Sequence, residues 1–523
     1  MADLLIRNAR IVDGTGAPSY RGDAAVEQGR ITALGNLQEI EAKQIIDARG
    51  AVLAPGFIDM HSHADFTLHV GPTADSLVQQ GITTAVVGQC GISPAPVSAE
   101  RREEAVTANQ LIREFTGQWR TLGAYLQDMR SIGFSPNLVP LVGQGTIRVA
   151  VMGTQAGAAD AAQIRGMQRE IERAMEDGAI GISTGLTYVP GCFSSTDELV
   201  AIFAPLEGEG LYFTHMRGSG ETLLDAVSEA IEIGRRMSMS VELSHFKAAG
   251  RPNWKNAGVA LALVESARGS GLDVSCDMYV YTAGSTSLLA MLPDWAQEGS
   301  AQAVLARLRD PALRRRMCEE MKVSTPYKHL EWDRVLITDA PDAEWEGMTV
   351  SALGDSERLD PYTWVLDALL SSELAGLIAM FMMSDENIEM QLTKPYMMIG
   401  SDGWGLSTEG PLSTGKPHPR CYGTYPRLLG KYVRQKHVLT LEDAIRKATG
   451  APAEKLGLRD RGLVKTGYWA DLVLFDALEI RDTATYEAPH QYPEGIRYVI
   501  VNGDVVVENG HHTGARPGRI VGK

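Results

Sequence analysis

The stretch Gly56-Phe57-Ile58-Asp59-Met60-His61-Ser62-His63-Ala64-Asp65 decides how the chain is interpreted. An apolar run leads into it, and two histidines one residue apart lie near its end. Residues i and i+2 of an extended strand point the same way, so His61 and His63 can hold one metal ion. Imidazole is a common ligand of zinc and similar metals. Taken alone, the pair also fits two unrelated polar residues at a strand end.

The composition of the 523-residue chain restricts its class. Its 44% apolar and 22% charged residues are ordinary for a folded globular protein, and its length predicts two or more structural units. The 49 basic and 65 acidic residues give a net charge of −16, which argues against a nucleic-acid-binding or anionic-membrane surface. A small anionic substrate remains compatible with this charge, because a local basic pocket can lie inside an acidic protein.

The cysteines and the N-terminus indicate the compartment. The five cysteines are few and widely spaced, so no disulfide framework is expected. The first residues lack the pattern of a secretory signal, and no stretch approaches about twenty apolar residues. These features predict a cytoplasmic protein with neither a membrane nor a nucleic acid as partner. The cysteines are Cys90, Cys192, Cys276, Cys318 and Cys421.

Strand-like runs are distributed in a way that predicts the fold. Short runs occur in residues 4–53 and again after residue 470, where Asn502-Gly503 between two alternating runs is a strong hairpin signal. Between these ends, strand-like and helix-like runs alternate, as in a parallel α/β fold. The strand-like runs are residues 56–63, 81–88, 138–143, 178–183, 211–214, 240–244, 272–276 and 396–400.

Eight such runs predict an α/β protein with a TIM (β/α)8 barrel and a small β-sandwich domain built from both chain termini. We place the barrel at residues 55–454 and the β-sandwich domain at residues 1–54 and 455–523. An insertion in the barrel is expected around residues 290–345, where residues 295–322 have a charged, helical pattern.

Polar residues recur where the predicted barrel strands end, the edge at which TIM barrels carry their active sites. One such residue fits an ordinary polar group at a barrel mouth, but a series of them in order predicts a metal site. The series is His61, His63, Cys90, His215, His245 and Asp402. The histidines outside this pattern, interpreted as unrelated to the site, are His69, His329, His437, His490, His511 and His512.

Further segments extend the pattern over nearly the whole chain. The most specific are the Cys90-Gly91 turn, Tyr188 and the segment His418-Pro419-Arg420. With these segments the chain resembles the metal-dependent amidohydrolase superfamily and, within it, the N-acyl-D-amino-acid deacylases, or D-aminoacylases. The resemblance rests on residues 55–65, 90–91, 185–191, 214–217, 242–247, 277–279, 283–286, 401–403, 418–420 and 423–427.

The resemblance implies a set of zinc ligands. Cys90, His215 and His245 would hold one tightly bound zinc, and His61 and His63 would frame a second, weaker position. Many members of the superfamily bridge two metals with a carboxylated lysine on the fourth strand. The fourth run here, residues 182–186, contains no lysine, so the Cys90 thiolate is expected to take that place.

Asp402 is the predicted general base, which takes a proton from water and returns it to the leaving amine. An aspartate before Gly403 also fits a simple turn residue. Lys247 lies two residues after His245 and would face the same mouth of the barrel. Arg420 can hold a carboxylate through a bidentate fork. Both cations also fit solvated surface charges.

In the family, the equivalents of five residues contact the acyl amino acid: Tyr188, Lys247, Tyr279, Ser285 and Arg420. Residues 404–417, which precede Arg420, form a longer segment than in the shorter family members. Since this segment leads to Arg420, it bears on the position of that side chain and on the substrate range.

These features predict a zinc-dependent amide hydrolase that removes the acyl group from small N-acyl-D-amino acids. One alternative is a cyclic-amide hydrolase of the hydantoinase or dihydroorotase type, against which the missing fourth-strand lysine argues. Another is a non-catalytic amidohydrolase-like scaffold. Such a scaffold would be expected to have lost ligands, whereas all six strand-end residues are present here.

Overall fold

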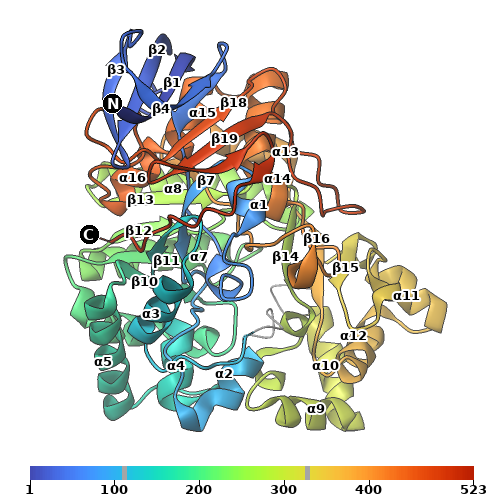
Figure 1. The fold of residues 1–523 in the computed structure, drawn as a ribbon. Helices are drawn as coiled ribbons and strands as arrows, with labels where there is room; N and C mark the ends of the chain where they lie inside the picture. The colour runs from blue at the N-terminus through green and yellow to red at the C-terminus, as the bar shows by residue number, and fades with distance from the viewer. Residues whose placement is uncertain (109–114, 324–329, 523) are drawn as a thin grey trace.

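The structure, a computed structural model, describes residues 1–108, 115–323 and 330–522. His329 therefore lies outside the described residues. Strands and helices alternate along most of the chain, so the α/β class is as predicted. Strands of both chain ends gather at the top of the molecule in Figure 1. None of the described helices combines the length and apolar character that crossing a membrane requires.

Both chain ends contribute strands to a single nine-stranded sheet. The sheet has the order β21-β20-β19-β18-β5-β1-β2-β3, and β4 pairs with β1. The two ends of the chain meet where β5 pairs antiparallel with β18. The strands are β1 (Ala2–Ile11), β2 (Tyr20–Glu27), β3 (Arg30–Gly35), β4 (Ala42–Asp47), β5 (Val52–Pro55), β18 (Leu472–Phe475), β19 (Ile496–Val501), β20 (Asp504–Glu508) and β21 (His511–His512).

The predicted hairpin at Asn502-Gly503 is present between β19 and β20. Both turn residues have positive φ, 50° and 90°, which is the backbone that a two-residue hairpin turn matching the twist of its strands requires. Glycine and asparagine adopt this conformation at the lowest steric cost. The local sequence therefore determines this pairing.

The remaining central strands are all parallel. A six-stranded sheet has the order β17-β13-β12-β11-β10-β9, and a three-stranded sheet has the order β6-β7-β8. The chain passes directly from β8 to β9, and the N–H of Met60 donates to the carbonyl of Ile399 (3.2 Å) next to β6 and β17. The strands are β6 (Phe57–Asp59), β7 (Ile82–Val87), β8 (Asn137–Pro140), β9 (Val142–Gly143), β10 (Gly181–Gly185), β11 (Leu211–His215), β12 (Ser240–Leu243), β13 (Val274–Met278) and β17 (Met397–Ile399).

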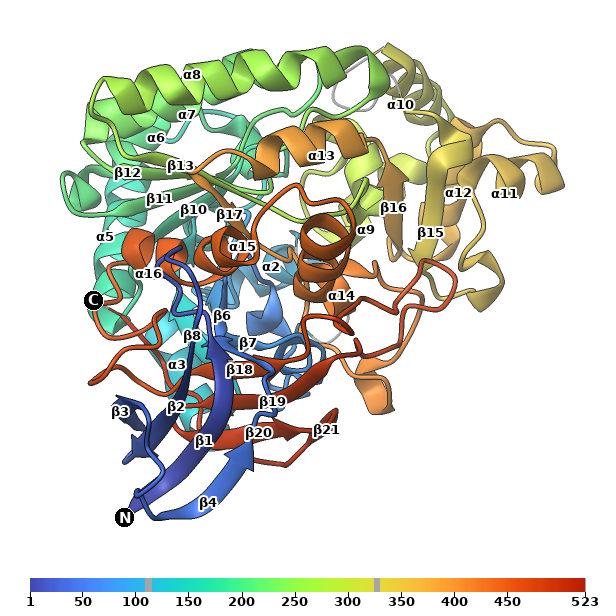
Figure 2. The same ribbon diagram turned by 90° about the horizontal axis from the view of Figure 1, so that it is seen from above.

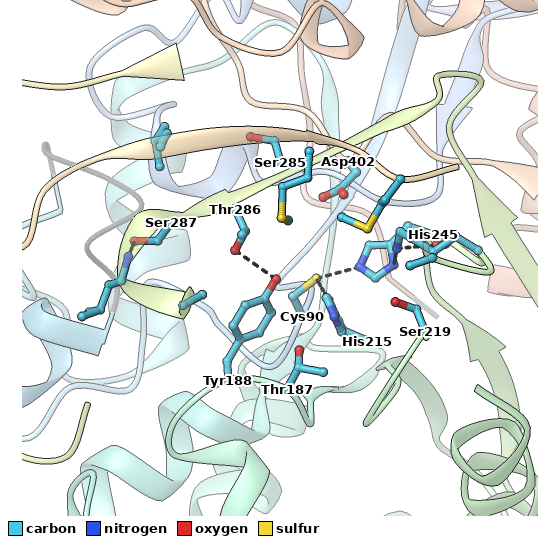
Figure 3. Close-up of a pocket in the computed structure, with 18 of the residues that line it drawn as sticks. Cys90, Thr187, Tyr188, His215, Ser219, His245, Ser285, Thr286, Ser287 and Asp402 are labelled. Carbon is cyan, nitrogen blue, oxygen red and sulfur yellow. Dashed lines mark hydrogen bonds between the residues drawn. The ribbon is translucent and has the colours of Figure 1, made fainter. Parts of the chain in front are cut away.

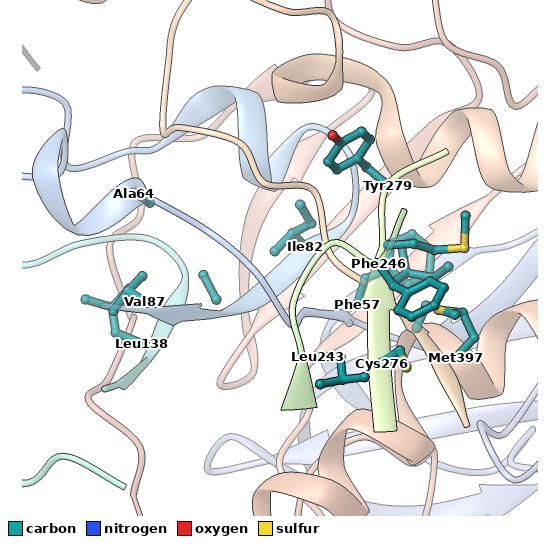
Figure 4. Packing of buried hydrophobic residues seen from close by; sticks show 14 of the residues in the cluster. Phe57, Ala64, Ile82, Val87, Leu138, Leu243, Phe246, Cys276, Tyr279 and Met397 are labelled. Carbon is teal, nitrogen blue, oxygen red and sulfur yellow. The ribbon is translucent and has the colours of Figure 1, made fainter. Parts of the chain in front are cut away.

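Buried apolar rows hold neighbouring strands together. Leu243 of β12 pairs with Cys276 of β13, which pairs with Met397 of β17. Figure 4 shows these three side chains close together within the largest core cluster. Such a row leaves the carboxyl ends of the strands as the place where polar side chains can gather.

Helices follow most of the parallel strands. In Figure 2, α7 and α8 run along the outside of β12 and β13. α5 shows why a helix begins and ends where it does: an Asp160–Gln163 capping box opens it, and Gly178 with φ 118° ends it. The helices are α1 (Asp75–Val78), α2 (Arg102–Ala108), α3 (Leu122–Ile132), α4 (Gln144–Met152), α5 (Ala161–Asp177), α6 (Thr196–Ile202), α7 (Leu223–Met237), α8 (Ala257–Gly269), α13 (Asp385–Leu392), α14 (Arg420–Arg427), α15 (Leu441–Ala448) and α16 (Gly450–Leu456).

A separate unit lies between β13 and β17, at the lower right of Figure 1. Its antiparallel sheet has the order β14-β16-β15, and its helices share a core around Trp364. Residues 290–323 and 330–345, where an insertion is expected, lie within this unit, which continues to Phe381. Its elements are β14 (Ala283–Ser287), α9 (Ala301–Arg309), α10 (Pro311–Val323), β15 (Val335–Asp339), α11 (Val350–Glu357), α12 (Pro361–Ser371) and β16 (Leu377–Phe381).

The helical pattern expected over residues 295–322 corresponds to two main helices rather than one. α9 ends before Asp310, whose carboxylate accepts the Ala312 N–H (2.8 Å) at the start of α10. A residue before a proline is disfavoured in the helical conformation, and aspartate is a good N-cap, so the Asp310-Pro311 pair interrupts the helix.

Candidate metal centre

The six strand-end residues meet at the carboxyl ends of the parallel strands. His61 and His63 follow β6, Cys90 follows β7, and His215 is the last residue of β11. His245 follows β12, and Asp402 follows β17. Figure 3 shows Cys90, His215, His245 and Asp402 directed into one pocket. The strands that the sequence predicted therefore deliver these side chains to one place.

Cys90 lies at the centre of this group. Its Sγ is 3.3 Å from Nε2 of His61, 3.6 Å from Nδ1 of His215 and 3.4 Å from Nε2 of His245. Two sets of potential ligands are present, and within each set the ligand atoms lie within 4.8 Å of one another. The first set is Cys90, His215 and His245, and the second is His61, His63, Cys90 and Asp402. Because Cys90 belongs to both sets, its sulfur can contact ions at two neighbouring positions.

The donor chemistry of both sets fits a zinc ion. Thiolate and imidazole are the ligands that zinc prefers, and a set of three leaves a position open for water. Burial raises the pKa of the Cys90 thiol, but the nearby His61 and His245 rings outweigh it and hold the pKa well below its usual range. A thiol of low pKa is available as the thiolate that a metal binds.

The backbone is strained at three of these residues. Cys90, His245 and Asp402 have φ of 55°, 36° and 52°, a region that residues other than glycine seldom adopt. The Cys90 turn also depends on Gly185 of β10, since a Cβ at that position would lie 2.1 Å from the Cys90 carbonyl oxygen. Strain of this kind gathers at functional sites, where the surrounding structure maintains it.

Asp277, near the end of β13, contacts two of the histidines, His61 and His245. Its Oδ1 accepts the His245 backbone N–H (2.8 Å) and lies 3.6 Å from Nδ1 of His61. Metal-binding histidines commonly have such a carboxylate partner, which orients the ring. No role was predicted for Asp277 from the sequence. Its position at a strand end, like that of the six site residues, was the signal that could have found it.

Two cationic side chains lie in the same pocket as the candidate metal ligands. Arg420 is 3% exposed, its Nη1 lies 2.7 Å from Oδ2 of Asp402, and its guanidinium stacks 4.8 Å from the ring centre of Tyr279. The longer segment of residues 404–417 therefore leaves Arg420 at the site. Lys247 is half-buried, and its Nζ lies 2.8 Å from Nδ1 of His245.

The charges in this pocket influence one another. Burial raises the pKa of Asp402, but Arg420 and then His63 outweigh it and hold the pKa well below its usual range. Burial lowers the pKa of Arg420, and the Asp402 carboxylate more than offsets this. Burial lowers the pKa of Lys247 to about 8. Asp402 and Arg420 are therefore both charged at neutral pH, as a buried ion pair.

The predicted substrate-contacting residues lie around the same cavity, which has a volume of about 180 Å³. Thr286 donates a hydrogen bond to the Tyr188 hydroxyl (3.3 Å), drawn in Figure 3, and the Tyr188 ring packs against His215. Ser285 reaches the cavity from β14. All predicted site residues line the cavity except His61, which is fully buried: His63, Cys90, Tyr188, His215, His245, Lys247, Tyr279, Ser285, Asp402 and Arg420.

The described histidines that were interpreted as unrelated to the site do not line this cavity. His490, for example, lies 2.8 Å from the Tyr422 hydroxyl, and His512 lies 3.0 Å from that of Ser135. His418 had no predicted role of its own. It is buried beside Arg420, and its place in the segment His418-Pro419-Arg420 was the available signal.

Comparison with known proteins gives the family of the chain. The amidohydrolase family matches the chain over residues 44–206 and 373–507. The chain belongs to the amidohydrolase family. It is 34% identical to a D-aminoacylase of Alcaligenes xylosoxydans xylosoxydans, over all of this chain and 98% of that protein. It is 36% identical to an N-acyl-D-aspartate deacylase of the same organism, over 99% of this chain and 95% of that protein.

Solved structures of such enzymes have the same fold. A crystal structure of D-aminoacylase matches with a TM-score of 0.86 at 34% identity, over the full length of both chains. N-acyl-D-glutamate deacylase of Bordetella bronchiseptica, complexed with zinc and a phosphonate mimic of the tetrahedral intermediate, matches with a TM-score of 0.85 at 31% identity over 99% of each chain. An L-hydantoinase of Arthrobacter aurescens reaches 0.59 at 17% identity over both full chains, which shows a related fold alone.

Proposed function

We propose that the protein is a zinc-dependent N-acyl-D-amino-acid deacylase, which cleaves the amide bond to give a carboxylate and a D-amino acid. One observation carries the proposal: the thiol–imidazole group and the buried Arg420–Asp402 pair face the same cavity. A group that activates an amide and a cation that holds a carboxylate are thus placed side by side. Full-length relatives named D-aminoacylase and N-acyl-D-aspartate deacylase support it.

We assign the tight zinc position to Cys90, His215 and His245, and a second, weaker position to His61 and His63. A zinc ion bound there would act as a Lewis acid that polarises the scissile carbonyl and activates water for attack. Since β10 carries no lysine, the Cys90 sulfur, shared by both ligand sets, would bridge the two positions. The low pKa of the Cys90 thiol supports this role.

Asp402 would be the general base. Its low pKa keeps the carboxylate ionised, so one of its oxygens can accept a proton from the attacking water. The same oxygen then returns the proton to the leaving nitrogen, which departs as a neutral amine. His63, whose Nε2 lies 3.3 Å from Oδ1 of Asp402, holds the carboxylate over the cavity.

Arg420 and Lys247 would bind the α-carboxylate of the substrate, with Tyr188, Tyr279 and Ser285 completing the pocket wall. A buried guanidinium can hold a carboxylate through two parallel hydrogen bonds. With the carboxylate held at a fixed distance from the metal ligands, the amide carbonyl has one productive placement. Inversion at the α-carbon would then misdirect the side chain, which produces selectivity for the D configuration.

The finer architecture is part of the proposal. We infer that the two parallel sheets close into a TIM (β/α)8 barrel over residues 55–454, with the unit around 290–345 inserted into it. The hydrogen bond between Met60 and Ile399 supports this closure. The nine-stranded sheet would belong to a β-sandwich domain of residues 1–54 and 455–523. Free cysteines and a thiolate-based site suit the reducing cytoplasm.

A substrate panel tests the function. Purified protein with measured zinc content is offered N-acetyl-D- and N-acetyl-L-amino acids and hydantoins. We expect hydrolysis of the N-acetyl-D-amino acids and about one tightly held zinc per chain. Faster cleavage of hydantoins would favour a cyclic-amide hydrolase. Absence of both zinc and hydrolysis would favour the non-catalytic scaffold.

A further inference from the structure

His418 connects three separate parts of the chain beneath the carboxylate-binding side of the pocket. It is 3% exposed. Its Nδ1 accepts the backbone N–H of Arg420 (3.0 Å), and its Nε2 lies 2.9 Å from the carbonyl oxygen of Ala283, the first residue of β14. The same Nε2 lies 3.1 Å from the hydroxyl of Tyr486, from the C-terminal part of the chain.

These contacts determine the tautomer of the ring. A backbone N–H can only donate, so Nδ1 must be unprotonated where it faces Arg420. The single proton of the neutral ring is then on Nε2, where it is donated to the Ala283 carbonyl. Burial and the neighbouring Arg420 charge lower the pKa of His418 well below its usual range, which keeps the ring neutral. Nδ1 is therefore a hydrogen-bond acceptor and Nε2 a hydrogen-bond donor.

The ring is also tightly enclosed. The ring centres of Tyr281 and Tyr486 lie 5.3 Å and 5.0 Å from that of His418, and Phe381 of β16 packs on Tyr486 at 4.7 Å. Pro417 and Pro419 flank His418 and stiffen the chain around it. The backbone of Arg420 is thus held by a rigid group of side chains, while its guanidinium contacts Asp402 and Tyr279.

We propose that His418 is a positioning residue that fixes the backbone of Arg420, and that Tyr486 extends this support to the C-terminal part of the chain. His418 does not reach the reacting atoms, so it would act on substrate binding through Arg420 rather than on the chemical step. The proposal rests on the proposed function, in which Arg420 holds the substrate carboxylate.

Variants that separate the two ring nitrogens test it. The amide oxygen of asparagine can replace Nδ1 as an acceptor, whereas glutamine reaches the position of Nε2, and phenylalanine replaces neither. For N-acetyl-D-leucine we expect His418→Gln and His418→Phe to raise KM about fivefold or more with kcat nearly unchanged. His418→Asn should recover most of the loss, and Tyr486→Phe should raise KM less than His418→Phe does.

His512 provides the matched control, because its Nδ1 accepts the N–H of Gly514 (2.8 Å), two residues later, as His418 does from Arg420. His512→Phe should leave KM unchanged. Cleavage of N-acetyl-3-methylbutylamine, which lacks the carboxylate, should be equal in wild type and the His418 variants.

Three outcomes would overturn the inference while the wild type remains active: an unchanged KM in His418→Phe, a loss confined to kcat, or an equal loss for the substrate without a carboxylate. A wild type that cleaves no N-acetyl-D-amino acid would instead overturn the proposed function, and this inference with it. Thermal unfolding measures whether each variant is folded. If His418→Phe is not folded, the Gln and Asn variants decide the matter: the inference requires a higher KM for His418→Gln than for His418→Asn.

Discussion

Nη1 of Arg420 lies 2.7 Å from Oδ2 of Asp402, and both side chains are buried next to the candidate metal ligands. The pair joins the two proposed functions of the pocket, carboxylate binding and proton transfer. A buried ion pair of this kind is costly to break by removal of one partner, because the other charge remains buried. Its two members can be tested separately, since they act on different parts of the substrate.

Arg420→Ala removes the cation that would hold the substrate carboxylate. Loss of a buried, hydrogen-bonded charge pair costs about 2–5 kcal/mol. We therefore expect kcat/KM for N-acetyl-D-leucine to fall roughly 30-fold or more. N-acetyl-3-methylbutylamine should already be a poor substrate of the wild type and should lose little further. Equal losses on both substrates would show that Arg420 does not bind the carboxylate.

Asp402→Asn keeps the size of the side chain but removes its basicity. If Asp402 transfers the proton, kcat should fall roughly 10²-fold or more. Zinc content, measured on the same preparation by mass spectrometry of the metal, should stay near the wild-type value because Cys90, His215 and His245 are unchanged. A variant with nearly normal turnover would mean that another group is the base.

The pH dependence of activity should respond to Arg420. The pKa of Asp402 lies well below the usual range of an aspartate, so the carboxylate is ionised and can accept a proton at neutral pH. Protonation of Asp402 should therefore not reduce wild-type kcat/KM between about pH 5 and 8. Removal of Arg420 removes the largest influence that lowers this pKa. The acid limb of Arg420→Ala should therefore move to higher pH.

This shift is measured on N-acetyl-3-methylbutylamine, so that the missing carboxylate contact does not contribute. Superimposable pH profiles of wild type and variant would show that the Arg420 charge does not control the protonation of Asp402.

The cations of the cavity lead to a prediction about the substrate side chain. The lysines and arginines among its described lining residues are Lys247, Arg251, Arg334 and Arg420. Arg251 and Arg334 both pair with Glu331, at 3.3 Å and 3.2 Å, and the other two would hold the α-carboxylate. A carboxylate on the substrate side chain would therefore have to compete with Glu331 for an arginine, which weakens its binding.

We expect kcat/KM for N-acetyl-D-leucine to exceed that for N-acetyl-D-aspartate and N-acetyl-D-glutamate at least about tenfold. Steady-state kinetics of the three substrates at one pH measures the ratio. Comparable rates would indicate that a pocket cation, such as Arg251, leaves Glu331 to bind the substrate side chain.

The grouping of the candidate metal ligands could be predicted from sequence because topology brings these residues together. His61, Cys90, His215 and His245 each follow or end a parallel strand, and the carboxyl ends of such strands share one edge. Position along the chain was therefore enough to group them. Tyr188, Tyr279 and Ser285 were expected from the resemblance alone, since nothing in the local pattern around them specifies a cavity. Lys247 was also indicated by its place two residues after His245.

Other features depend on contacts that a local pattern does not encode. β14 pairs with β16 across the whole inserted unit, and His418 lies beside a carbonyl 135 residues away in the chain. The sequence does not assign a role to Asp277, because that role depends on its tertiary contacts with His245 and His61. In each case the partner is determined by tertiary packing, which periodicity does not describe.

The last prediction concerns the sulfur that both ligand sets share. Cys90→Ala removes the one ligand atom common to the two groups and leaves the four histidines in place. The wild type should keep about one tightly bound zinc and fill the second position only in excess metal. Since imidazoles alone form a weaker set than a thiolate with imidazoles, Cys90→Ala should lose both the tight zinc and the activity after dialysis.

Cys276→Ala is the matched control, because Cys276 is also buried but packs between β12 and β17. It should lower the thermal stability by the cost of a small cavity and keep its zinc. Metal analysis after dialysis against a mild chelator, with both variants and the wild type side by side, separates the two cysteines. Full zinc occupancy in Cys90→Ala would remove Cys90 from the site.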